Sequence, residues 1–78
     1  MNTFRPNLRV VETEGTYRVR GSCMVTGKEY EATYPKDGVV RWLDGAHIQD
    51  AMPDVSAGDR EFLISGISPA GWEQLFAE

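Results

Sequence analysis

The chain has few of the residues that cross-link or anchor a small protein. Its 78 residues include one cysteine, Cys23, and one histidine, His47. One thiol cannot form an internal disulfide, and a lone cysteine suits a reducing compartment better than a secreted setting. The first fifteen residues, MNTFRPNLRVVETEG, contain no long apolar run. We therefore expect neither a signal peptide nor a membrane span, and a cytoplasmic protein.

The length predicts a single domain, residues 1–78, with a small core, because a chain of this size buries only about 60% of its unfolded surface. The net charge of −4 is unevenly distributed. Residues 1–35 have five basic and four acidic side chains, whereas residues 36–78 have three and eight. An acidic half disfavours binding to a phosphate backbone, which needs clustered lysine and arginine. It is compatible with docking on a basic protein surface.

Alternating residues in the first half predict a small antiparallel sheet of two or three strands. The expected strands are residues 7–15, 16–25 and 29–35. In TYRVRG, Tyr17 and Val19 point to one side and the arginines after them to the other, which is the period of a half-buried strand. Gly27 in TGK can adopt a positive φ and predicts the turn before the last strand. Such a sheet needs a covering layer, because a bare hairpin is marginal in water.

Three or four short helices are predicted in the second half, where they would cover one face of the sheet in an α+β fold. The expected helical segments are residues 37–45, 46–53, 56–66 and 68–76. Asp37, Ser56 and Ser68 are the predicted N-caps, and Gly66 is a predicted C-cap. The side chains expected to be buried in the last two helices are Phe62, Leu63, Ile64, Trp72, Leu75 and Phe76.

The segment CMVTG has the outline of half a zinc knuckle. Structural zinc takes four Cys or His ligands, commonly as two C-x-x-C pairs. Thr26 stands where the first pair would have its second cysteine, and Ser68 and Gly71 have the spacing of a second pair. Serine lacks the soft thiolate that zinc prefers. Cys23 with His47 does not make a zinc site, so we expect no metal and no other cofactor, and Cys23 as a small core residue.

Three segments, CMVTGKEY, RWLDGAHIQDAMPDVSAGDREFLISG and SPAGWEQLF, resemble a widespread set of small proteins encoded by phages, prophages and bacterial genomes. The likeness extends from residue 23 to residue 76, and its most distinctive pieces are IQDA-x-P and REFLISG. It implies a zinc-ribbon-like fold with a degenerate metal site at Cys23, Thr26, Ser68 and Gly71. It also implies a phage or mobile-element setting, but no particular activity.

An acidic stretch, residues 44–61, is the predicted partner-binding surface. Its carboxylates surround Ile48, Met52 and Val55, and a charged rim around exposed apolar side chains is typical of a docking face. The same apolar residues can instead be core anchors of the helical layer. The side chains predicted to bind the partner are Asp44, Asp50, Asp54, Asp59 and Glu61.

These features favour a non-enzymatic protein-interaction module that occludes a basic surface on a host protein. The phage setting that the resemblance implies makes an inhibitor of host defence or nucleic-acid handling, of the anti-CRISPR or anti-restriction type, a consistent interpretation. A homodimer that uses the edge of the first strand is compatible with this function. Catalysis by Cys23 with His47 is disfavoured, because the residues around them indicate neither an oxyanion hole nor a substrate pocket.

The alternative is a zinc-ribbon-like nucleic-acid-binding or transcription accessory protein. It would use Arg18, Arg20 and Lys28, since a basic strand face beside aromatic side chains can stack single-stranded bases. Glu29 and Glu31 on the neighbouring strand can instead pair with the arginines across the sheet. The pairing is the favoured interpretation, so nucleic acid is the less favoured partner.

Overall fold

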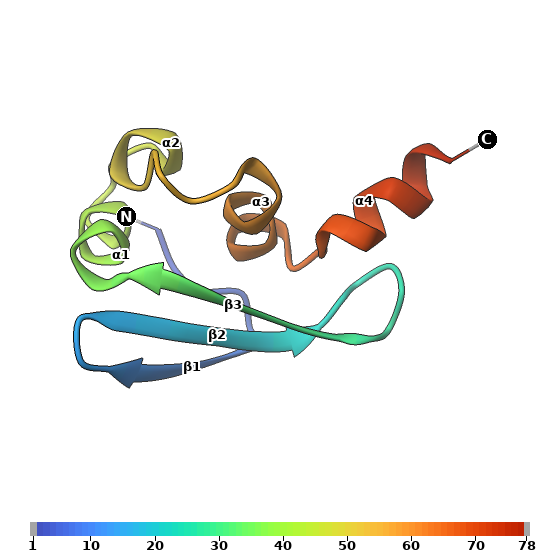
Figure 1. Cartoon of the computed structure of the whole chain (residues 1–78), viewed down its shortest axis with the longest axis horizontal. Helices are drawn as coiled ribbons and strands as arrows, with labels where there is room; N and C mark the ends of the chain where they lie inside the picture. Colours follow the sequence, from blue (N-terminus) through green and yellow to red (C-terminus); the bar gives the residue numbers. More distant parts are fainter. Residues whose placement is uncertain (1, 78) are drawn as a thin grey trace.

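Three antiparallel strands are followed along the chain by four short helices in the computed structural model, which describes residues 2–77. The strands are β1 (Leu8–Thr13), β2 (Thr16–Ser22) and β3 (Glu29–Pro35), and the helices are α1 (Lys36–Leu43), α2 (Ile48–Ala51), α3 (Ala57–Ser65) and α4 (Pro69–Phe76). The sheet order is β1-β2-β3, and the helices lie on one side of it (Figure 1). The predicted α+β class is confirmed.

Residue alternation gives the sheet one buried and one exposed face. Val19 of β2 is fully buried, and its register partners are Val10 on β1 and Ala32 on β3. Arg18 and Arg20 of the same strand are exposed, as the period of two predicts. The helices therefore cover the face that carries Val19, and the face that carries the arginines is exposed to solvent.

The turn between β2 and β3 forms where the sequence predicts it. Gly27 adopts a φ of 74°, which glycine reaches without steric cost. Its N–H donates to the carbonyl of Cys23 at 2.9 Å, and the N–H of Cys23 donates to the carbonyl of Lys28 at 2.8 Å. These bonds close a loop in which Cys23 lies just after β2, so the strand is shorter than predicted.

The last two helices begin as predicted. The hydroxyl of Ser56 accepts from the N–H of Asp59 at 3.2 Å, and the hydroxyl of Ser68 accepts from the N–H of Gly71 at 3.2 Å. Each serine satisfies one of the backbone donors that the first turn of a helix leaves free. Gly66 ends α3 with a φ of 77°, as the predicted C-cap requires.

The prediction for the start of α1 was wrong. Pro35 is the N-cap and makes no side-chain cap, while Asp37 lies in the first turn and accepts from the N–H of Gly38 at 3.0 Å. The reason is that β3 ends at Pro35 and α1 begins at Lys36, so no loop separates them in which a capping residue could lie. The carboxylate of Asp37 still lies near the positive end of the helix.

The core lies between the covered face of the sheet and the helices α1, α2 and α3. Its largest fully buried side chains come from both layers: Tyr34, Phe62, Met52, Leu63, Val19 and Val39. The ring of Tyr30 meets the ring of Phe62 edge to face, with centroids 4.9 Å apart. Each large apolar side chain that is fully buried stabilises the fold by about 1.5–3 kcal/mol.

Three side chains expected in the core are exposed instead. Ile64 of α3 is 41% exposed, and Leu75 and Phe76 of α4 are 52% and 76% exposed. The first turn of α4 packs on the body, whereas its last turn extends past the end of the sheet (Figure 1). The apolar stripe predicted for this helix is therefore present, but only the first turn, which contains the buried Gly71, has the body beneath it.

One polar cluster joins β3 to the start of α3. The hydroxyl of Tyr34 donates to the backbone carbonyl of Asp59 at 2.6 Å, and the hydroxyl of Tyr30 donates to its carboxylate at 2.5 Å. Tyr34 is fully buried, and a buried hydroxyl without a partner would cost about 1–3 kcal/mol. The cluster therefore fixes the position of α3 along the sheet.

Raising the pH is expected to weaken this cluster. The hydrogen bond to Asp59, together with burial, raises the pKa of Tyr30 from 10.0 to about 12. Because this pKa is higher in the folded state, the stabilisation from Tyr30 is complete below pH 10 and is lost as the pH rises towards 12. In urea titrations, the free energy of unfolding should fall more steeply over this range for the wild type than for Tyr30→Phe. Tyr17→Phe, outside the cluster, should keep the wild-type slope, and equal slopes for all three proteins would contradict the assignment.

Candidate functional site

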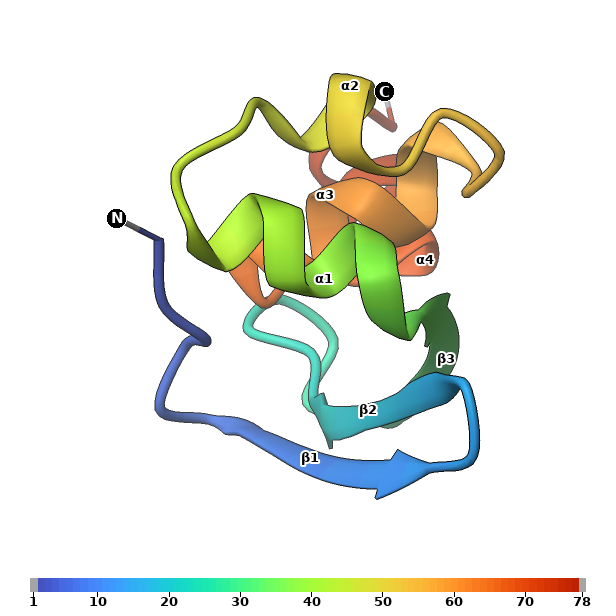
Figure 2. The ribbon, with the colours of Figure 1, turned by 90° about the vertical axis from the view of Figure 1, so that its left-hand side faces the viewer.

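Three of the five predicted partner-binding carboxylates lie in and around α2. Asp50 belongs to α2, Asp44 follows α1 and Asp54 follows α2, and all three are exposed. Figure 2 shows α2 as the outermost part of the helical layer, above α1 and α3. Within residues 2–77, none of the three forms an ion pair. We call Asp44, Asp50 and Asp54 the acidic cap.

The other two predicted carboxylates, Asp59 and Glu61, belong to α3 and are only partly exposed. The carboxylate of Asp59 is the acceptor of Tyr30 in the cluster described above, so it holds the fold together. Sequence reasoning missed this role because the partner tyrosine lies 29 residues earlier in the chain. The acidic cap is therefore smaller than the predicted surface.

The apolar residues within the acidic stretch belong to the core. Ile48 is 7% exposed and Met52 is 1% exposed, while Val55 is partly buried against the core cluster. The expected surface, in which carboxylates surround exposed apolar side chains, is therefore not formed by these residues. The alternative interpretation, that they anchor the helical layer, is confirmed.

Arg41 is the basic side chain that connects α1 to α2. One guanidinium nitrogen donates to the carbonyl of Ala51 at 2.9 Å, and another lies 3.7 Å from the carboxylate of Asp37. The positive charge of Arg41 is thus directed to the backbone of α2 and to α1. It forms no ion pair with the acidic cap, whose negative charge remains available to a partner.

The four degenerate knuckle positions converge on one sulfur atom. The Sγ of Cys23 accepts hydrogen bonds from the backbone N–H groups of Val25 at 3.4 Å, Thr26 at 3.5 Å and Ser68 at 3.3 Å. Ser68 lies 45 residues further along the chain. Gly71 is so close that a Cβ atom added to it would lie 2.6 Å from the same sulfur. The spacing therefore identified two segments that do meet in space.

The donor set does not fit a structural zinc ion. Cys23 supplies the one thiolate, whereas zinc sites of this kind use four Cys or His ligands. The hydroxyls of Thr26 and Ser68 accept from the backbone N–H groups of Lys28 and Gly71 instead. Within residues 2–77, no group of three or more His, Cys, Asp or Glu side chains is placed to hold a metal ion.

Cys23 is buried as predicted, but its thiol is more than an apolar filler. Burial by itself would raise the pKa, but hydrogen bonds from Ser68 and Thr26 outweigh it and lower the pKa from 9.0 to about 6. Successive backbone N–H groups form a concave site that favours an anion. These N–H groups therefore favour the thiolate form of Cys23 over the thiol, and at 3% exposure the sulfur is shielded from solvent.

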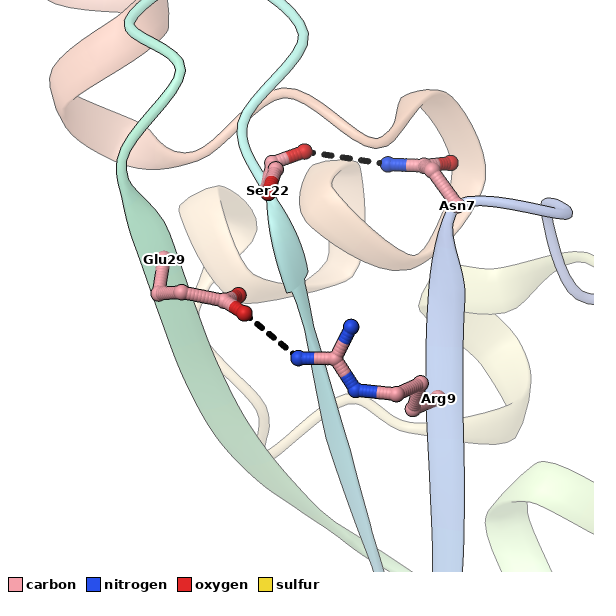
Figure 3. Close-up of polar contacts among 4 residues, drawn as sticks. All are labelled: Asn7, Arg9, Ser22 and Glu29. Atoms are coloured by element: carbon pink, nitrogen blue, oxygen red, sulfur yellow. Dashed lines mark hydrogen bonds and ion pairs between the residues drawn. The ribbon is translucent and has the colours of Figure 1, made fainter.

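The exposed face of the sheet carries paired charges. The guanidinium of Arg9 donates to Glu29 at 2.5 Å (Figure 3), and that of Arg18 lies 4.0 Å from Glu31. The predicted pairing of arginines with glutamates across the sheet is confirmed for Arg18. Tyr34 is buried on the opposite face, so it offers no ring on which a base could stack. This face therefore does not favour the nucleic-acid alternative.

Comparisons with protein-family models, with curated proteins and with solved structures find no match to this chain. Among residues 2–77, no helix has the length and apolar character needed to span a membrane.

Gly71→Ala is expected to destabilise the protein by about 1–2 kcal/mol, because the new methyl group would collide with the sulfur of Cys23 and with Ile67. This loss should exceed the gain of up to about 1 kcal/mol that alanine brings to a helix. Ala70→Gly, an exposed change in the same helix, controls for propensity. In a Cys23→Ala background, urea titration should show a smaller cost of Gly71→Ala. If Gly71→Ala lowered the free energy of unfolding equally in the wild-type and Cys23→Ala backgrounds, the predicted contact between Gly71 and the sulfur would be contradicted.

The thiolate is expected to make stability depend on pH. Because the pKa of Cys23 is about 6 in the folded protein and 9.0 ordinarily, its stabilisation is complete above pH 9 and is lost as the pH falls through 6. The difference in free energy of unfolding between the wild type and Cys23→Ser should therefore grow between these two pH values, measured under reducing conditions. A constant difference would show that the thiol stays protonated in the folded state.

Proposed function

We propose that the chain is a non-enzymatic interaction module whose acidic cap docks on a basic surface of another protein. The observation that carries this function is the group of three exposed carboxylates, Asp44, Asp50 and Asp54, that α2 and its flanking segments present and that form no ion pair among residues 2–77. The rest of the second half is acidic as well, within a net charge of −4. A patch of one sign accelerates the encounter with a patch of the other sign and excludes partners of like charge.

The partner class is a host protein whose basic surface normally holds nucleic acid. Carboxylates spread over a small rigid face can occupy cationic side chains that would otherwise contact phosphates. The resemblance to phage-encoded proteins favours a target in host defence or nucleic-acid handling, and the module would inhibit it by occlusion. A non-enzymatic role is supported by Cys23, whose sulfur is shielded and bound to backbone N–H groups rather than to a general base.

Reversing the charge of the acidic cap is expected to abolish partner binding. Tagged wild-type protein should capture a basic protein from host lysate, and salt should release it, because exposed charges are screened. The double variant Asp50→Lys/Asp54→Lys should weaken the affinity for the captured protein by at least about tenfold, or 1.4 kcal/mol. Glu14→Lys/Glu31→Lys makes the same charge change at exposed carboxylates outside the cap and serves as the matched control.

Competition separates occlusion from simple attachment. A DNA or RNA duplex should displace the wild-type module from the captured protein, since both would occupy the same cations. Undiminished binding of the double variant, or binding unaffected by saturating nucleic acid, would discard the occlusion model.

A further inference from the structure

A pocket of about 460 Å³ opens at the end of the molecule that carries the start of the chain. Residues 2–5 form one side and residues 45–49 form the other. The buried side chains of Trp42 and Ile48 lie at its base, beside the half-exposed Ile64. We call this the basic pocket, because Arg5 and His47 are among the residues that line it.

The lining of the basic pocket contains cationic and polar side chains, although Asp44 and Asp50 flank residues 45–49 in the sequence. Arg5 supplies a permanent positive charge, and His47 and Gln49 supply side chains that can donate hydrogen bonds, whereas the amide of Asn2 donates to the carbonyls of Trp42 and Ala46. Among the described residues that line it, none has a carboxylate, although the chain has twelve acidic side chains. The pocket therefore fits a ligand that combines an apolar group with a negative charge.

The opposite end of the molecule carries such a group. Leu75 and Phe76 in the last turn of α4 are 52% and 76% exposed, and the ring of Phe76 stacks on that of Trp72 with centroids 5.9 Å apart. Glu73 is exposed and lies three residues before Phe76, so the two side chains neighbour each other on the helix surface. We call Glu73, Leu75 and Phe76 the acidic tip.

The chain cannot bring these two surfaces together within one molecule. The longest dimension of the molecule is 37 Å, and α4 lies at the far end from the start of the chain and from α1 and α2 (Figure 1). Pairing of α4 with α4 in a symmetric dimer would give Glu73 no cation to pair with, because α4 has no basic side chain. When two complementary surfaces lie at opposite ends of a protein, the first surface of one copy can instead bind the second surface of the next copy.

We propose that the acidic tip of one copy docks in the basic pocket of a second copy. Phe76 would lie against Trp42 and Ile48, with Glu73 directed to Arg5. The contact is heterologous, so it builds a row or a closed ring rather than a two-fold dimer. Two apolar side chains and one ion pair bury much less surface than the roughly 1,200 Å² of a stable interface. The association is therefore weak, with a Kd on the order of 0.1 mM.

This proposal does not use the acidic cap, so it and the proposed function can fail separately. Sedimentation velocity tests it on the full chain. The weight-average mass of the wild type should rise about fivefold between about 10 µM and about 1 mM, as head-to-tail association with a Kd of that order requires. Phe76→Ser and Arg5→Glu, two changes at exposed positions or at the pocket rim, should each stay monomeric when alone.

Mixing the two variants gives the decisive result. Phe76→Ser keeps an intact pocket and Arg5→Glu keeps an intact tip, so the equimolar mixture should form one-to-one dimers that extend no further. Arg20→Glu, the matched charge reversal on the exposed face of the sheet, should associate like the wild type. A wild type that is monomeric at about 1 mM, a self-associating Arg5→Glu, or a monomeric mixture would overturn the proposal.

Discussion

The sulfur of Cys23 joins the turn after β2 to the start of α4. It accepts a hydrogen bond from Ser68, and the neighbouring N–H of Met24 donates to the carbonyl of Gly66 at 3.0 Å. These bonds hold the turn between α3 and α4 against the turn between β2 and β3. The position of α4 depends on them, because its last turn extends past the body. A single buried sulfur thus connects segments that a bound ion or a disulfide connects in many chains of this size.

Much of the fold could be predicted because its signals are local. The alternation around Val19 identified the covered face of the sheet, and Ser56 and Ser68 identified helix starts, since each effect acts within a few residues. The start of α1 was missed because Pro35 passes directly from strand to helix. The exposure of Phe76 was missed because spacing shows that a helix has an apolar stripe but not whether any part of the protein lies beneath it.

The candidate site was harder to predict than the fold. Charge along the sequence indicated an acidic surface, and Asp44, Asp50 and Asp54 are indeed exposed together around α2. The charge pattern could not indicate that the carboxylate of Asp59 accepts a hydrogen bond from a tyrosine of β3. The pocket beside Arg5 was also missed, because its walls come from separate parts of the chain. Pairing between distant residues decides which charges are free to act, and a single sequence does not contain that information.

The order of the strands has a consequence for how the chain folds. Every strand pairs with its neighbour in sequence, and the helices α1 to α3 follow without long crossovers. Topologies with such local contacts belong to the faster-folding class, since little loop entropy is lost before pairing begins. The bonds from the turn after β2 to the turn before α4 are non-local, and the one between Cys23 and Ser68 spans 45 residues. During synthesis on the ribosome the three strands can pair early. The contacts that hold α4 can form only when the end of the chain has emerged.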